Sequence, residues 1–271
     1  MTHEHPLAIV IRTAGTNCDR EMCRAFAMAG ARVDLIHLDR LIRQPSLLDE
    51  ADLIGFPGGF SYGDDVAAGR VKAVKCRVGL WPALRAAAER GACMMGACNG
   101  FQVMTQIGLL PGFEPGAWPD EPPEPVVALA DNAQDRFVDR WTRIETDATS
   151  PCVWTAGLTG DTEVMMLPIA HGEGRFVSAH AGRIDDLRRT RRIAVTYASD
   201  DNPNGSEGDV AGLCDPSGRI IGLMPHPERY LEWSHHPFAT RLSDAQRRGD
   251  PPGLRMFRNA VEHVRTGVGV K

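Results

Sequence analysis

The chain has 271 residues and carries 30 basic against 35 acidic side chains, a net charge of −5. This sign is wrong for a protein that holds nucleic acid mainly by neutralising phosphates, so nucleic acid is not an expected partner. Hydrophobic residues make up 43% and charged residues 24%, which excludes a wholly disordered or fibrous chain. A length near 270 residues allows one large α/β domain or two smaller ones.

The cysteine pattern and the lack of long apolar runs indicate a cytoplasmic protein. Seven cysteines, an odd number without a C-x-x-C pair, argue against a disulfide scaffold and against a cysteine zinc site. The amino-terminal stretch from Met1 lacks a basic region, and its apolar run ends at Arg12, too early for a signal peptide. Nothing approaches the roughly 20 apolar residues of a membrane span, so no membrane partner is expected.

In the first hundred residues, short apolar runs alternate with segments of helical periodicity. The run Leu7–Ile11 is apolar throughout, as in a strand buried on both faces. This alternation predicts a doubly wound, mostly parallel α/β sheet flanked by helices. We expect strands at 7–11, 33–37, 53–56 and 93–96, and helices at 19–29 and 81–90.

The rest of the chain predicts a partly antiparallel extension of the same sheet. The stretch 111–125 holds six prolines and two glycines, which favours a long surface excursion. We then expect strands at 126–130, 143–146, 164–169, 193–197, 210–214 and 220–224, and a closing helix at 254–264. The stretch 234–253, rich in Arg, Asp and Pro, is interpreted as an exposed insertion. The chain is thus interpreted as one domain, 1–271, with two surface insertions.

The clearest chemical motif is Gly96-Ala97-Cys98-Asn99-Gly100, between a predicted strand and a helical stretch. It parallels the G-x-S-x-G nucleophile elbow, in which small residues allow a sharp turn that presents the nucleophile. Unpaired N–H groups at the start of the following helix favour a thiolate and can hold an oxyanion. The alternative is a small buried cysteine beside packing glycines.

A cysteine nucleophile needs a base and a group that orients the base. The segment Met224-Pro225-His226-Pro227-Glu228 offers both, because each proline favours an extended residue before it and side chains i and i+2 then share a face. Glu228 can therefore fix the tautomer of His226. The alternative is that the two residues cap and begin a helix that runs to Trp233.

Three further segments extend the pattern, namely 15–19 (Gly-Thr-Asn-Cys-Asp), 57–64 (Pro-Gly-Gly-Phe-Ser-Tyr-Gly-Asp) and 168–176 (Pro-Ile-Ala-His-Gly-Glu-Gly-Arg-Phe). With the elbow and the His-Pro-Glu segment, the chain resembles the triad-type (class I) glutamine amidotransferases. Within them it resembles the glutaminase subunits of phosphoribosylformylglycinamidine synthase. The entry Arg12-Thr13-Ala14-Gly15 departs from the frequent Phe-Pro-Gly, and the two insertions are longer than usual for such subunits.

The resemblance implies a flavodoxin-like fold and a mechanism. Cys98 would attack the amide carbon of glutamine, His226 would protonate the leaving ammonia and activate water against the thioester, and Glu228 would orient His226. The backbone N–H groups of Gly59 and Asn99 would form the oxyanion hole. Three side chains are candidates for binding the α-amino and α-carboxylate groups of glutamine, although the turn that holds two of them is equally explained as structural: Gln102, His171 and Glu173.

The resemblance also implies partners, because ammonia released into water becomes mostly ammonium, which is not a nucleophile. The chain contains no ATP-binding P-loop motif. ATP and magnesium are therefore expected on a large synthetase subunit, with a small accessory subunit in the same complex and no cofactor on this chain. An amidotransferase subunit of another pathway, a stand-alone cysteine hydrolase and a subunit without catalysis are the alternatives. A metal enzyme built on His226, His235 and His236 is disfavoured, since the neighbouring prolines break helical ligand spacing.

Overall fold

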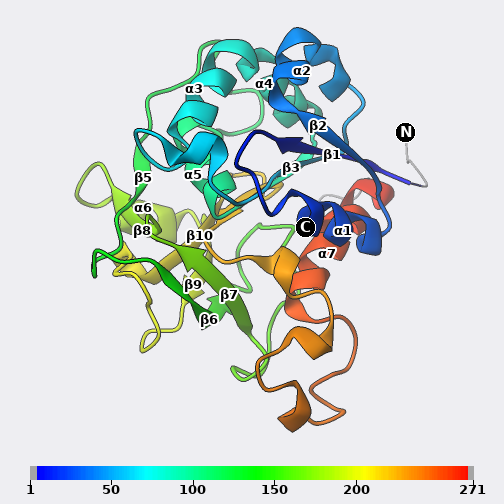
Figure 1. Cartoon of the computed structure of the whole chain (residues 1–271), viewed down its shortest axis with the longest axis vertical. Coiled ribbons are helices and arrows are strands. Elements are labelled where there is room, and N and C mark those ends of the chain that lie inside the picture. Colours follow the sequence, from blue (N-terminus) through cyan, green and yellow to red (C-terminus); the bar gives the residue numbers. More distant parts are fainter. Residues whose placement is uncertain (1–4, 268–271) are drawn as a thin grey trace.

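The computed structural model describes residues 5–267. Residues 1–4, where a signal peptide was not expected, and residues 268–271 of the predicted 1–271 domain lie outside the described residues. A nine-stranded sheet crosses the molecule in the order β2-β1-β3-β4-β11-β10-β9-β6-β7 (Figure 1). The first five strands are parallel: β2 (Arg32–His37), β1 (Leu7–Arg12), β3 (Leu53–Phe56), β4 (Cys93–Ala97) and β11 (Ile220–Leu223). The other four continue antiparallel: β10 (Val210–Cys214), β9 (Ile193–Tyr197), β6 (Val138–Thr146) and β7 (Met166–His171).

Helices cover both faces of the parallel half, because successive side chains of a strand point to opposite sides. On β1, Ile9 joins one hydrophobic core and Val10 joins the other. The first core lies under α2 (Leu38–Arg43), α3 (Arg70–Gly79), α4 (Trp81–Arg90) and α5 (Asn99–Ile107). The second lies under α1 (Asp19–Ala29) and α7 (Pro252–Thr266), which pack side by side (Figure 1). The prediction of a doubly wound, mostly parallel sheet with an antiparallel extension is confirmed.

Three helices were not predicted: α2, α3 and α6 (Arg183–Arg189). The case of α3 shows the reason, because its buried side chains are Lys72, Ala73 and Cys76, which form no recognisable apolar stripe. The helices at 19–29 and 81–90 have the predicted bounds. Strand bounds agree to within a few residues, except that the strand expected at 143–146 is the end of the longer β6.

One strand was assigned to the wrong sheet. The strand expected at 126–130 is β5 (Val127–Ala130), and it pairs with the unpredicted β8 (Arg175–Ser178) in a separate two-stranded sheet. A buried apolar run predicts a strand but carries no information about its partner.

The two insertions are more closely packed than the sequence suggests. The stretch 111–125 has no helix or strand, as predicted, but it is anchored by Trp118 against Trp81. In the stretch 234–253, predicted to be exposed, His236 and Leu242 are buried and the last two residues begin α7. That prediction is therefore only partly right. Among residues 5–267, none of the helices has the length and apolarity needed to cross a membrane.

Candidate active site

Cys98 lies between β4 and α5, at the carboxyl edge of the parallel strands, where ligands bind in open α/β sheets. Its backbone has φ +51° and ψ −111°, a positive-φ conformation that non-glycine residues rarely adopt. The Cys98 N–H donates to Leu223 O on β11 at 2.8 Å, which fixes the turn to the neighbouring strand. Such strain costs on the order of 1–3 kcal/mol and persists only where the surroundings impose it. The nucleophile elbow predicted from the sequence is present.

Close packing explains the glycines of the elbow. A Cβ atom added at Gly100 would lie 1.8 Å from Phe56 O, and one at Gly96 would lie 2.4 Å from Met104 Sδ. A side chain at either place would push α5 off the sheet. The two glycines therefore allow the helix to begin directly above the strand ends, with Cys98 as the residue before its first turn.

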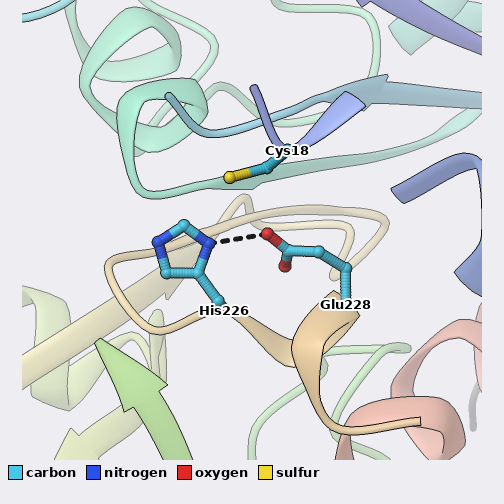
Figure 2. A group of neighbouring side chains, drawn as sticks. All are labelled: Cys18, His226 and Glu228. Atoms are coloured by element: carbon cyan, nitrogen blue, oxygen red, sulfur yellow. Dashed lines mark hydrogen bonds and ion pairs between the residues drawn. The ribbon is translucent and has the colours of Figure 1, made fainter. Parts of the chain in front are cut away.

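His226 and Glu228 form a buried pair at the end of β11. His226 Nδ1 and Glu228 Oε1 are 2.6 Å apart, and the two side chains are 2% and 0% exposed (Figure 2). The segment Pro227–Arg229 forms a single 3-10 turn rather than the start of a helix to Trp233, so the helix-cap alternative is wrong. The His226 N–H donates to Pro168 O at 2.8 Å, which ties the segment to β7.

The charge balance at His226 favours the imidazolium. Burial alone would lower the pKa of His226, but the Glu228 carboxylate and the Cys98 sulfur beside it outweigh burial and raise that pKa well above its ordinary value. The other ring nitrogen, Nε2, is buried and has no hydrogen-bond partner within residues 5–267. The imidazole therefore has a free proton-transfer atom on the side opposite the carboxylate.

Gly58 shows that the pair and the nucleophile border the same space. A Cβ atom added there would lie 2.7 Å from His226 Cε1 and 3.3 Å from Cys98 Cβ. In the described part of the chain, the N–H groups of Gly59 and Asn99 donate to no protein acceptor. The structure thus brings together the three predicted catalytic residues and leaves the two predicted oxyanion donors available.

The Phe-Ser-Tyr-Gly-Asp motif connects the oxyanion loop to α5. Ser61 Oγ donates to Asn99 Oδ1 at 2.7 Å, and Asn99 Nδ2 donates to Asp64 Oδ1 at 2.9 Å. The turn places Tyr62 and Asp64 at φ +56° and +50°. These bonds hold the loop that contains Gly59 at a fixed distance from the elbow, which is what a preorganised oxyanion hole requires.

The three residues predicted to bind glutamine lie beside the elbow but already bond to the protein. Gln102 donates through Nε2 to Glu173 O and accepts at Oε1 from Asn99 Nδ2. Glu173 Oε2 accepts from Ala68 N at 3.1 Å. His171 Nδ1 lies 3.1 Å from Asn132 Oδ1, and its Nε2 is buried without a partner in the described residues. Their role in binding glutamine stays a prediction.

Cys18 also reaches the pair, although no role of its own was predicted for it within the 15–19 segment. Its sulfur, with a nitrogen of His226 and a carboxylate oxygen of Glu228, forms a buried set of possible metal ligands within 4.8 Å of one another (Figure 2). Two ligands of a tetrahedral zinc ion stand about 3.3 Å apart, given zinc bonds of about 2.0 Å. The observed 2.6 Å between Nδ1 and Oε1 is shorter than this spacing and is the length of a hydrogen bond, so these two atoms do not share a zinc ion. His235 and His236, by contrast, bond to Leu231 N and Glu163 O.

The model of the CobB/CobQ-like glutamine amidotransferase domain matches residues 5–264. The chain belongs to this glutamine amidotransferase family. Among its relatives, phosphoribosylformylglycinamidine synthase subunit PurQ of Dehalococcoides mccartyi is 38% identical over 95% of this chain and 97% of that protein. The same subunit of Methanococcus maripaludis is 37% identical over the same shares of the two chains.

Solved structures agree with the assignment to the amidotransferase family. A chain of PurLQS from Thermotoga maritima has 30% identity and a TM-score of 0.68, covering 96% of this chain and 99% of that one. A glutamine amidotransferase from the same organism has 13% identity and a TM-score of 0.53, covering 97% and 99%, and so shares the fold alone. The class I amidotransferase fold expected from the motifs is therefore confirmed.

Proposed function

We propose that this chain is the glutaminase subunit of phosphoribosylformylglycinamidine synthase. The observation that carries the proposal is the strained Cys98 elbow beside the buried His226–Glu228 pair, in a chain whose relatives over almost their whole length are named as that subunit. A cysteine, an imidazole and an orienting carboxylate at one strand edge are the groups that acyl transfer through a thioester needs.

The chemistry proceeds in two steps. The Cys98 sulfur attacks the side-chain amide carbon of glutamine, and the N–H groups of Gly59 and Asn99 hold the oxyanion. His226 protonates the departing ammonia through Nε2, which leaves a γ-glutamyl thioester. A water molecule that gives its proton to His226 then attacks the thioester carbon, the carbon–sulfur bond breaks, and glutamate leaves as the thiolate returns.

The ammonia passes to a synthetase subunit, which uses it with ATP to amidate formylglycinamide ribonucleotide in purine biosynthesis. The 30% identity to a chain of the Thermotoga maritima PurLQS structure supports a complex with a large synthetase subunit and a small accessory subunit. We place ATP and magnesium on the synthetase and no cofactor on this chain. All seven cysteines lie in the described residues and form no disulfide, which supports the proposal that the protein acts in the reducing cytoplasm.

The experiment that tests the proposal is labelling with diazo-oxo-norleucine, an electrophile that mimics glutamine, followed by intact-mass analysis and peptide mapping. A single adduct on Cys98 is expected, absent in Cys98→Ala and retained in Cys23→Ala, which makes the same change away from the site. Glutaminase activity should rise when the synthetase and the accessory subunit are added. A chain that stays unlabelled both alone and in the complex would refute the assignment.

A further inference from the structure

Cys18 lies against the catalytic pair although it is far from it in the sequence. It immediately precedes α1, is 1% exposed, and its N–H donates at 3.3 Å to the carbonyl of Gly58, in the oxyanion loop. Figure 2 shows its sulfur above the His226–Glu228 hydrogen bond. The sulfur lies within 4.8 Å of a ring nitrogen of His226 and of a carboxylate oxygen of Glu228. A residue tied to the oxyanion loop at its backbone and to the catalytic pair at its side chain is well placed to control their geometry.

The sulfur also receives a guanidinium. Arg229 Nη2 donates to Cys18 Sγ at 3.1 Å, and Arg229 Nε lies 3.4 Å from Glu21 Oε1 on α1. Arg229 directly follows Glu228 in the chain, and Glu228 Oε2 is buried without a hydrogen-bond partner in the described residues. A guanidinium that turned to this free oxygen would form a charge-assisted bond and draw the carboxylate charge away from His226.

We propose that Cys18 is a positioning residue of the catalytic pair, whose buried thiol binds the Arg229 guanidinium and keeps it off the Glu228 carboxylate. The inference rests on the proposed glutaminase function. The negative charge of Glu228 then stabilises the His226 imidazolium alone, and this imidazolium is the group that protonates ammonia.

The chemistry of a buried thiol suits this role. Burial raises the pKa of Cys18, so the sulfur stays protonated and adds no negative charge that would compete with Glu228. Its proton points to Asn17 Oδ1 at 3.3 Å, which leaves a weak acceptor free for the guanidinium. Titratable and charged groups from β7, the elbow and the 3-10 turn also face the pair, namely His171, Cys98 and Arg229, and Glu21 of α1 contacts Arg229.

The test is the pH profile of kcat/KM for glutaminase in the complex of full-length subunits. In Cys18→Ala the guanidinium is released toward Glu228, so the alkaline limb, which reports deprotonation of His226, should move down by about one pH unit. We expect kcat to fall about tenfold and KM to stay within about twofold. Cys18→Ser, which keeps an acceptor for Arg229, should retain the wild-type limb. Cys23→Ala, on the helix that follows Cys18 but away from the pair, is the control.

A double variant separates positioning from packing. Arg229→Met in the Cys18→Ala background removes the displaced guanidinium and should return the alkaline limb toward the wild-type position. An unmoved limb in Cys18→Ala, or a shifted limb that the second substitution does not restore, overturns the inference. If Cys18→Ala does not fold, Cys18→Val fills the same space without an acceptor and should shift the limb in the same direction.

Alkylation of Cys98 by iodoacetamide provides a readout that does not depend on glutamine. The alkylation rate is measured against pH in the chain alone. The step in this rate that reports deprotonation of His226 should move down by the same amount in Cys18→Ala as the alkaline limb of the glutaminase profile does. An active wild-type complex with unchanged profiles overturns only the role of Cys18. A wild-type complex without glutaminase activity overturns the proposed function, and the alkylation profile then decides the role of Cys18 by itself.

Discussion

Replacing Glu228 by Gln tests the catalytic pair directly. The substitution keeps the size of the side chain but removes the charge 2.6 Å from His226 Nδ1. A hydrogen bond to a charged group contributes about 1.5–3 kcal/mol and a neutral one about 0.5–1.5, so the imidazolium loses about 1–2 kcal/mol of stabilisation. At 1.36 kcal/mol per unit, the pKa of His226 should fall by about one unit.

A second effect follows from the tautomer. The Gln amide can donate to Nδ1, which places the imidazole proton on Nε2. A protonated Nε2 cannot accept a proton from Cys98 or from water. We therefore expect kcat to fall by about ten-thousandfold, as an amide in the place of the carboxylate does in serine protease triads.

The assay is the glutaminase pH profile of the complex. We expect the alkaline limb of kcat/KM to lie about one pH unit lower in Glu228→Gln than in the wild type. Glu262→Gln makes the same chemical change at an exposed position of α7, away from the pair and from Arg229, and is the control. A Glu228→Gln enzyme with an unshifted limb and activity within about threefold of the wild type would show that the carboxylate neither charges nor orients the imidazole.

Three other substitutions test the packing and the buried charges. Gly100→Ala places a Cβ atom 1.8 Å from Phe56 O and should abolish labelling of Cys98 by diazo-oxo-norleucine, whereas Gly160→Ala, with nothing within 4 Å, should leave it intact. Burial and the neighbouring His226 lower the pKa of His171 to about 4, below its unfolded value near 6.5. Acid therefore favours the unfolded chain, and the free energy of unfolding should drop by about 1.4 kcal/mol per pH unit from pH 6.5 to 4. Urea titrations at several pH values should find a smaller slope in His171→Asn. Burial lowers the pKa of Lys72 to about 8, so Lys72→Met should raise the free energy of unfolding at pH 7 by about 1–3 kcal/mol, and a destabilised variant would contradict this.

The features that could be predicted from the sequence are local ones. The helix at 19–29 has apolar residues on one face and a glycine after its end, and it forms with those bounds. The elbow depends on glycines within a five-residue segment. His226 and Glu228 pair as predicted, but through a 3-10 turn at Pro227–Arg229 and not through the extended segment that the prolines led us to expect. In each case the decisive physics lies within one turn or one strand.

The partner of a strand is decided at long range. β5 was detected as a strand, yet nothing in its four residues indicates that it pairs with Arg175–Ser178 rather than with the large sheet. The same limit explains α3, where the buried lysine is accepted because Ile11 O and the Phe56 ring receive its ammonium group. Only the folded arrangement supplies these partners.

Cys18 combines both difficulties. The sequence contains seven cysteines, and nothing in the residues around position 18 distinguishes a thiol that packs from one that binds a guanidinium. Its partner Arg229 lies 211 positions away, and the two meet because β1 and β11 end at the same edge of a parallel sheet. A parallel sheet gathers loops from distant parts of the chain, so the groups that perform the chemistry can be recognised by motif, whereas the groups that set their charge are found only by contact.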